Sequence, residues 1–229
     1  DQNIETNTQS QRAEGASGRC VVMISPDAER TMHTHLGVSG SIDSSDLDLS
    51  AADRSKYIYL EGYLVTSPSA RAAIIELKRY AESQGVSTAM TFSDPSMLEY
   101  FRDNINEVLG TGVDLLFCNE RELGLWAQTD DFEAAFTKAQ GFAKKLVVTL
   151  GAKGALLFDG DRRIPIAPNA VNAIDTNGAG DMFAGAFLYG ITNGMDFEAA
   201  GNLASLASAR VVSNFGPRLA PEEHAAILG

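Results

Sequence analysis

Seven residues near the C-terminal end of the chain combine side chains that could carry out one particular reaction. The run Asp175-Thr176-Asn177-Gly178-Ala179-Gly180-Asp181 lies between an apolar stretch, 170–174, and an amphipathic helical stretch, 182–191. A Gly-Ala-Gly run that opens a helix has no bulky side chain to block an anion. Its free backbone N–H groups and the positive end of the helix dipole attract one.

Asp181 follows the glycines at once, and a carboxylate beside a bound phosphate is repulsive unless it takes a proton from an attacking hydroxyl group. The pattern therefore predicts phosphoryl transfer to an alcohol, with Gly178, Ala179 and Gly180 as an anion cradle and Asp181 as the general base. The alternative is an ordinary glycine-rich strand-to-helix turn with a capping Asp.

The elements that must position this run follow a strand–helix alternation. Strands are predicted at 57–60, 86–92, 114–118 and 146–150, and helices at 68–83, 97–109, 119–126, 132–144, 178–192 and 197–213. A hairpin of 154–158 and 162–167 and a strand pair, 20–25 and 31–36, complete the prediction. Alternation at this spacing favours a mostly parallel sheet covered on both faces.

Length and charge restrict the class of protein. The 229 residues suit one large α/β domain, and a net charge of −12 without a basic run argues against a nucleic-acid surface. Cys20 and Cys118 are far apart, lie in apolar stretches and form no CxxC pair, so we expect buried, reduced thiols and a cytoplasmic location. No apolar run reaches membrane-spanning length, so we expect no membrane partner.

Polar segments follow four of the predicted strands directly, a fifth follows the apolar stretch 170–174, and ligands bind beyond the carboxyl ends of strands in open α/β sheets. These segments are 61–62, 93–94, 119–122, 149–151 and 175–181. The sequence predicts that they outline one site.

The run 175–181, followed by the small residues Ala184, Gly185 and Ala186, resembles the second signature of the ribokinase-like, phosphofructokinase-B (PfkB) carbohydrate kinases. The resemblance covers nearly the whole chain. It implies a three-layer α/β/α sandwich with a small β lid, one domain over 1–229 with lid strands from 18–38, and ATP as phosphoryl donor.

Two further segments resemble motifs of this family. Asn119-Glu120-Arg121-Glu122 is similar to the Asn-x-x-Glu motif, which implies that Glu122 holds Mg²⁺ through water and that Asn119 lies at the nucleotide. The alternative is an N-cap Asn with acidic residues in the first helical turn. The run from Thr149 to Gly154 is similar to the Thr-x-Gly-x-x-Gly stretch, which implies that Thr149, Gly151, Lys153 and Gly154 bind nucleotide; an ordinary glycine-rich turn is the alternative.

The same resemblance implies an adenine contact from Asn202 and a K⁺ site that includes Asp175, although a solvent-facing Asn202 is an equally good interpretation. Ser96 and Leu98 stand where many sugar kinases of the family have Asn and Arg, and this weakens a hexose interpretation. The stretches 59–63 and 28–32 are closer to bacterial adenosine-kinase-like members. The expected acceptor is therefore a nucleoside such as adenosine, with a ribose or fructose kinase as one alternative and a non-catalytic nucleotide or sugar sensor as another.

Family chains begin with a strand and a Gly-Gly-x-x-x-Asn substrate segment, which we do not find here. We expect residues 1–18 to lead into the lid strands and the domain to be incomplete at its N-terminus. Many members dimerise through lid strands, so a homodimer through 20–25 and 31–36 is a further expectation.

Overall fold

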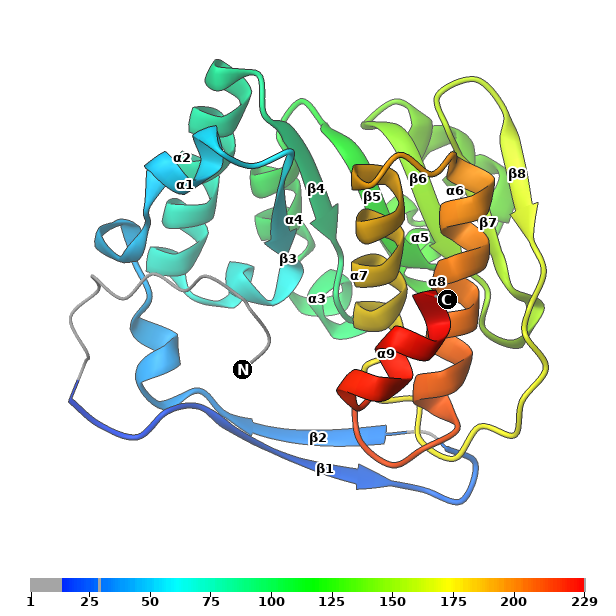
Figure 1. The fold of residues 1–229 in the computed structure, drawn as a ribbon. Helices are drawn as coiled ribbons and strands as arrows, with labels where there is room; N and C mark the ends of the chain where they lie inside the picture. Colours follow the sequence, from blue (N-terminus) through cyan, green and yellow to red (C-terminus); the bar gives the residue numbers. More distant parts are fainter. Residues whose placement is uncertain (1–13, 29, 229) are drawn as a thin grey trace. The chain divides into compact units, whose positions relative to one another are not determined.

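The computed structural model describes residues 14–28 and 30–228 (Figure 1). Segment 1–13, most of the predicted lead-in, lies outside them. The chain divides into two compact units, each described below by itself. Among described residues, the first comprises 14–21 and 33–113, and the second comprises 22–28, 30–32 and 114–228. Strands β1 (Arg19–Ile24) and β2 (Arg30–His35) form a separate two-stranded sheet.

The first unit is built on a parallel strand pair. β3 (Tyr57–Glu61) pairs with β4 (Ser87–Thr91), with Tyr57 opposite Ser87. The long helix α2 (Pro68–Gln84) connects them, as parallel strands require. Ser67 caps its start, Pro68 occupies the first turn, and Gly85 ends it in the left-handed conformation. The remaining elements are η1 (Gly37–Ser41), η2 (Ser44–Asp46), α1 (Leu49–Asp53), η3 (Gly62–Thr66), α3 (Pro95–Tyr100) and α4 (Arg102–Leu109).

The second unit contains four neighbouring strands. Their order is β5 (Val113–Asn119), β6 (Ala143–Thr149), β7 (Ala155–Phe158) and β8 (Arg163–Ile166), and the last two pairings are antiparallel. Leu115, Leu116, Leu146 and Val148 on β5 and β6 are fully buried. Continuous apolar runs of this kind are typical of strands covered on both faces.

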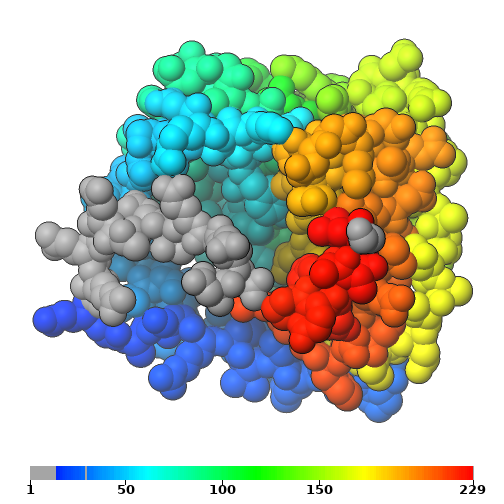
Figure 2. Space-filling view, in the orientation of Figure 1, coloured from blue at the N-terminus to red at the C-terminus, as the bar shows by residue number. Residues whose placement is uncertain are grey.

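Helices of the second unit pack on these strands and on one another. They are α5 (Glu120–Ala127), α6 (Phe132–Gln140), α7 (Ala179–Thr192), α8 (Phe197–Val212) and α9 (Pro221–Leu228), with the short η4 (Gly151–Lys153). Phe187 of α7 meets Phe117 of β5 and Phe197 of α8 edge to face, at ring-centroid distances of 5.9 and 4.9 Å. α7 and α8 run along each other, and α9 lies on α8 (Figure 2).

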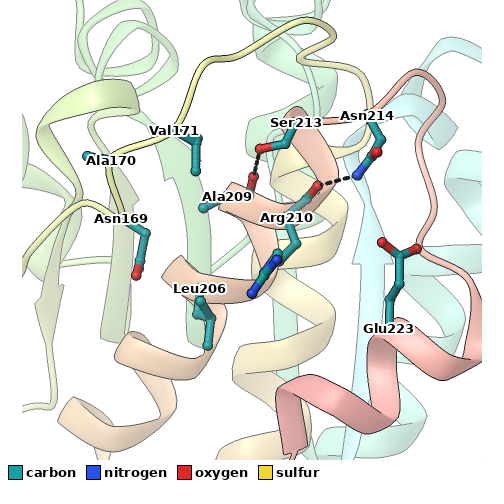
Figure 3. Close-up of a pocket in the computed structure, with 9 residues that line it drawn as sticks. All are labelled: Asn169, Ala170, Val171, Leu206, Ala209, Arg210, Ser213, Asn214 and Glu223. Atoms are coloured by element: carbon teal, nitrogen blue, oxygen red, sulfur yellow. Dashed lines mark hydrogen bonds between the residues drawn. The ribbon is translucent and has the colours of Figure 1, made fainter.

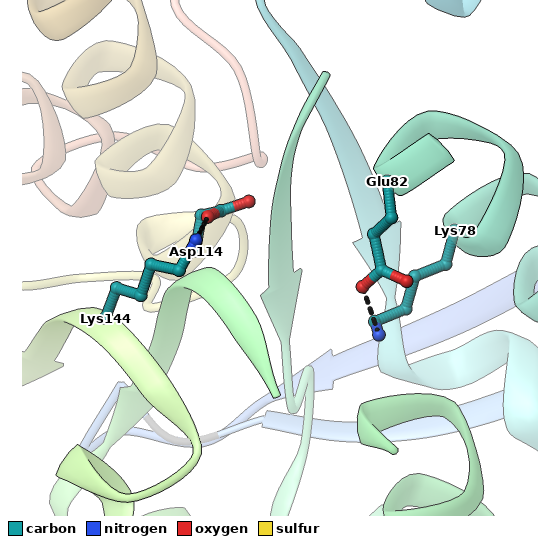
Figure 4. A network of polar contacts seen from close by, with 4 residues as sticks. All are labelled: Lys78, Glu82, Asp114 and Lys144. Atoms are coloured by element: carbon teal, nitrogen blue, oxygen red, sulfur yellow. Dashed lines mark hydrogen bonds and ion pairs between the residues drawn. The ribbon is translucent and has the colours of Figure 1, made fainter. Parts of the chain in front are cut away.

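Two lysine–carboxylate ion pairs differ in how far the lysine side chain is exposed to solvent (Figure 4). In the first unit the ammonium of Lys78, which is buried, lies 2.7 Å from Glu82 one turn later on α2. In the second unit Lys144, with 79% of its side chain exposed, lies 2.7 Å from Asp114. Burial of the Lys78 stem makes the first contact part of the packing, whereas solvent screens the second.

The predicted elements are found with three differences. The helix predicted over 97–109 is two helices, because Phe101 has φ −130° and ψ 24° and interrupts the α conformation. The helix predicted over 132–144 ends at Gln140, and β6 starts at Ala143, where the ring of Phe142 packs on Trp126. The sequence did not indicate α1 or α9, which are short. Within the described residues, no helix is long and apolar enough to cross a membrane.

Candidate active site

The Gly-Ala-Gly run forms the start of α7, as predicted. Gly178 is the N-cap residue, with φ +77° and ψ 1°, a backbone conformation that favours glycine. Gly178 is also packed closely: an added Cβ would lie 2.5 Å from the carbonyl oxygen of Pro217. Gly180 faces open space, because a Cβ added there would have no atom within 4 Å. The cradle therefore has one face against the protein and one face open.

The first turn of α7 supplies backbone donors beside Gly180. The N–H groups of Gly180 and Asp181 occupy positions where a helix has no internal acceptor. The N–H of Ala179 donates to the carbonyl of Thr176 over a long 3.3 Å. Asp181 itself is exposed in the first turn of α7. An anion at this position would meet backbone donors and, beside them, a carboxylate.

Asp175 holds the run in place. Its carboxyl group is 3% exposed and accepts hydrogen bonds from the N–H of Asn177 and from the N–H of Gly216, both at 2.8 Å. A carboxylate that bridges two backbone donors fixes their spacing. Asp175 thereby ties the segment before α7 to the loop after α8.

The turn of the β1–β2 hairpin is the second anchor. Thr176 donates from its hydroxyl to the carbonyl of Ala28 at 2.9 Å, and the backbone N–H of Thr176 approaches the same oxygen at 3.3 Å. Arg30 lies 3.4 Å from the Thr176 hydroxyl. Ala28 is buried and has φ +65°, so its unusual backbone is held by these contacts. No local pattern in the sequence marks this contact, because Ala28 and Thr176 are 148 residues apart.

Asn119 and Glu122 form a capping box at the start of α5. The Asn119 side chain accepts from the N–H of Glu122 at 2.8 Å, while the Glu122 carboxylate accepts from the backbone N–H and the side-chain amide of Asn119, each at 2.9 Å. Glu122 is buried. The preceding residue, Cys118, is also buried, and burial together with the charge of Glu122 raises the pKa of its thiol well above the ordinary value.

The Thr149–Gly154 segment adjoins the start of α5. Lys153 reaches Glu120 at 3.5 Å, which brings the two predicted nucleotide segments together. Gly154 has φ +92°, and an added Cβ would lie 2.0 Å from the carbonyl oxygen of Ile166. The start of β7 and the end of β8 therefore pack too closely for a side chain at position 154, which requires glycine there. Gly151 is exposed, with φ +58° and open space around it, and Thr149 is half-buried.

A pocket of about 500 Å³ lies beside α8 (Figure 3). Its lining comprises Asn169, Ala170, Val171, Leu206, Ala209, Arg210, Ser213, Asn214 and Glu223. The cradle is linked to this lining, because Ser208, next to Ala209, donates its hydroxyl to the carbonyl of Ala179 at 2.6 Å. Asn202 is exposed one turn before the first lining residue of α8. The buried polar residue of this helix is Ser205, which sequence reasoning missed.

The described residues contain no group of three or more His, Cys, Asp or Glu side chains that could hold a metal ion. The Glu122 carboxylate, hydrogen-bonded within the capping box, fits a Mg²⁺ ion that takes most of its ligands from water and phosphate, which is how this ion usually binds beside nucleotides. A direct bond to the metal would compete with the capping box.

The family model for pfkB family carbohydrate kinases matches residues 1–224. The chain belongs to this family. An adenosine kinase structure from Sinorhizobium meliloti is 34% identical, with a TM-score of 0.85 over 91% of this chain and 65% of that one. An uncharacterized sugar kinase of Archaeoglobus fulgidus is 27% identical over 90% of this chain and 81% of its own length.

The pfkB-family chain also has the fold of a ribokinase structure from Thermotoga maritima, with a TM-score of 0.72, 22% identity and coverage of 95% of this chain and 71% of that one. The predicted ribokinase-like α/β class is therefore confirmed. The chain spans just under two thirds of the S. meliloti adenosine kinase. The roles assigned to individual site residues, the single-domain boundaries and the cytoplasmic location stay predictions.

Proposed function

We propose that the chain carries the phosphoryl-transfer site of an ATP-dependent kinase that phosphorylates a hydroxyl group of a nucleoside such as adenosine, or of a sugar. The observation that carries the proposal is the start of α7: open backbone donors at Gly180 and Asp181, with Asp181 exposed beside them. Two anchors, through Asp175 and Thr176, hold this turn. Family membership supports the same reaction class.

In the proposed reaction Asp181 accepts the proton of the attacking hydroxyl group, and the N–H groups of the Gly178–Gly180 turn stabilise charge on the transferred phosphoryl group. Such a transfer needs little covalent chemistry from the protein. Catalysis then consists of positioning and charge stabilisation. The double anchoring of the turn supplies the positioning.

The nucleotide base is proposed to occupy the pocket beside α8, whose volume of about 500 Å³ is in the range of small-ligand sites. Thr149, Gly151, Lys153 and Asn119 are proposed to lie along the nucleotide. Bound Mg²⁺, held indirectly by Glu122, would neutralise phosphate charge. Asp175 remains the proposed side chain for K⁺, in addition to its observed hydrogen bonds.

The test of the reaction is Asp181→Asn, which removes the base without changing the size of an exposed side chain. We expect kcat to fall by about 10²–10⁴-fold with ATP affinity unchanged. Asp161→Asn, an exposed carboxylate in the β7–β8 loop, is the matched control and should keep wild-type turnover. Near-normal kcat in the Asp181 variant would rule out the proposed base.

Acceptor choice is tested with adenosine, inosine, ribose and fructose in parallel. Adenosine-dependent ADP release supports the nucleoside kinase, and release only with ribose or fructose supports a sugar kinase. ATP binding without turnover on any of these acceptors would favour a sensor. The relatives include both adenosine and sugar kinases, so the assay must decide.

A homodimer through the lid strands is proposed from the exposed apolar residues of β1. Val21 and Met23 are 63% and 51% exposed and, two residues apart, share one face of the strand. Burial of this face against a second copy would remove both from water. Sedimentation velocity should show a dimer that Met23→Glu dissociates, and a monomeric wild-type protein would contradict this part of the proposal.

A further inference from the structure

Two histidines lie side by side on one face of β2. His33 and His35 are both exposed, and residues two apart on a strand point to the same face of a sheet. Thr34, between them, donates its hydroxyl to Sγ of Cys20 on β1 at 3.3 Å, so these two side chains share a face. The two histidines therefore lie on the opposite face.

The residues of β1 on the histidine face follow from the same alternation. Arg19 and Val21 flank Cys20, so both lie on the face of His33 and His35, and both are exposed. Val21 is also one of the exposed apolar residues for which a homodimer is proposed above. The histidine pair is therefore continuous with the proposed dimer face.

The spacing of the histidine pair suits a metal ion that binds nitrogen. The rise of a strand places the Cα atoms of His33 and His35 about 7 Å apart. A tetrahedral Zn²⁺ with Zn–N bonds of about 2.0–2.1 Å needs its ligand nitrogens about 3.3 Å apart. Both imidazoles are exposed and can lean toward each other by this amount. One strand thus supplies two zinc ligands.

The other two ligands must come from elsewhere, because structural zinc sites are almost always bound by four side chains. Within the ranges 14–28 and 30–228, no group of three or more His, Cys, Asp or Glu side chains could hold a metal ion. In a dimer with two-fold symmetry the same patch of both subunits meets itself. A second copy would therefore bring its own histidine pair to the ion.

We propose that His33 and His35 form half of a zinc site and that the histidine pair of a second copy completes it, so that Zn²⁺ bridges two copies of the chain. The site is distinct from the proposed Mg²⁺ at the nucleotide, since Zn²⁺ accepts imidazole nitrogen and Mg²⁺ prefers oxygen ligands. The inference rests on the homodimer within the proposed function.

The experiment uses the full chain without a polyhistidine tag, first stripped of metal with EDTA. Calorimetry with Zn²⁺ alone should give one ion per two chains. Sedimentation velocity should show that Zn²⁺ lowers the dissociation constant of the dimer by about tenfold or more, because an ion that binds only the dimer stabilises it. Mg²⁺ at the same concentration should leave that constant unchanged.

Single variants test the ligands. His33→Gln and His35→Gln should each abolish binding at one Zn²⁺ per two chains and remove the effect of Zn²⁺ on the dimer. Both side chains are exposed, so thermal unfolding in EDTA should match that of the wild type. Arg19→Ala should tighten zinc binding, because it removes a positive charge from the same face.

His224→Gln is the matched control. His224 is the third histidine of the sequence and lies on α9, exposed and away from β2 in the sequence. This variant should bind Zn²⁺ as the wild type does. A Zn²⁺ response that persists in both His33→Gln and His35→Gln would overturn the inference.

The state of the protein in EDTA separates the inference from the proposed homodimer. A dimer in EDTA that Zn²⁺ does not tighten, or binding of one Zn²⁺ per chain, would overturn the inference alone. A monomer in EDTA that Zn²⁺ converts into a dimer would support the inference and show that the apolar face is insufficient without the ion. A monomer under both conditions would overturn the homodimer and the inference together.

Discussion

Replacing Gly178 and Gly180 separately by alanine should affect stability and activity in opposite ways. At Gly178 an alanine would have φ +77°, and its Cβ would lie 2.5 Å from the carbonyl oxygen and 2.7 Å from the Cα atom of Pro217. The left-handed conformation costs about 1–2 kcal/mol for a residue with a Cβ. Overpacking against backbone adds about 1–3 kcal/mol. We therefore expect Gly178→Ala to lower the free energy of unfolding by about 2–5 kcal/mol.

Gly180→Ala differs from Gly178→Ala both in backbone conformation and in the space around the added Cβ. Gly180 is in the first turn of a helix, without a positive φ, and a Cβ there meets no atom within 4 Å. Alanine is favoured over glycine in helices by up to about 1 kcal/mol, so the variant should be as stable as the wild type or slightly more stable. The added methyl group enters the space proposed for the phosphoryl group. ATP affinity or kcat should therefore fall while the fold is unharmed.

Gly194→Ala is the control that isolates the contact with Pro217. Gly194 follows α7 in the same unit, has φ +89° and has open space around it. It should show the conformational cost of about 1–2 kcal/mol alone. Urea denaturation with a constant m-value gives all three stability changes.

Two results would refute the reasoning about the cradle. A Gly178→Ala protein no less stable than Gly194→Ala would show that the close approach to Pro217 does not constrain the turn. Unchanged ATP affinity and turnover in Gly180→Ala would show that phosphate does not bind over the first turn of α7.

The remaining predictions concern charges and thiols away from the cradle. Cys20, which the apolar stretch around it predicted to be buried, is exposed, because β1 is largely exposed. Iodoacetamide at pH 8 should therefore label Cys20 and spare Cys118 in the native protein, because burial raises the pKa of Cys118 and keeps it a protonated, inaccessible thiol. Mass spectrometry of the labelled peptides checks this, and equal labelling would contradict the burial of Cys118. Lys78→Ala should destabilise the protein by about 1–3 kcal/mol, since it removes buried packing as well as an ion pair, whereas Lys144→Ala should cost less than about 1 kcal/mol. Thermal unfolding in low and high salt separates the two: equal destabilisation by both variants would show that the Lys78 stem contributes no packing.

The local pattern of residue types was sufficient to predict the alternation of strands and helices and the start of α7. The spacing of apolar residues placed β3–β8 and the long helices, because each element buries a face that its own periodicity marks. Gly178-Ala179-Gly180 could be assigned to a helix start because capping is decided by a few neighbouring residues. Asn119 and Glu122 likewise form the capping box that was the alternative interpretation of that motif, and their proposed role at the nucleotide is an addition to it.

Contacts between distant residues could not be predicted in this way. The break at Phe101 has no local glycine or proline, and it comes where Asn104 of α4 donates to the carbonyl of Val65 in η3. Asn202 of α8 is exposed, in agreement with the solvent-facing interpretation, and its adenine contact stays a prediction, whereas the buried Ser205 of the same helix was not singled out from the sequence. Which face of a helix is buried depends on what packs against it.

The sequence alone therefore identifies the residues proposed to carry out the chemistry, which are an aspartate directly after small residues at a helix start. How that turn is held is a property of the folded molecule, through Asp175 to Gly216 and through Thr176 to Ala28. The same is true of the side chain of Asn169 in the lining of the pocket beside α8, which donates to the hydroxyl of Ser205, 36 residues away. The difference arises because a helix start is specified by bonds within one turn, whereas an anchoring side chain is oriented by a partner that the fold brings from elsewhere in the chain.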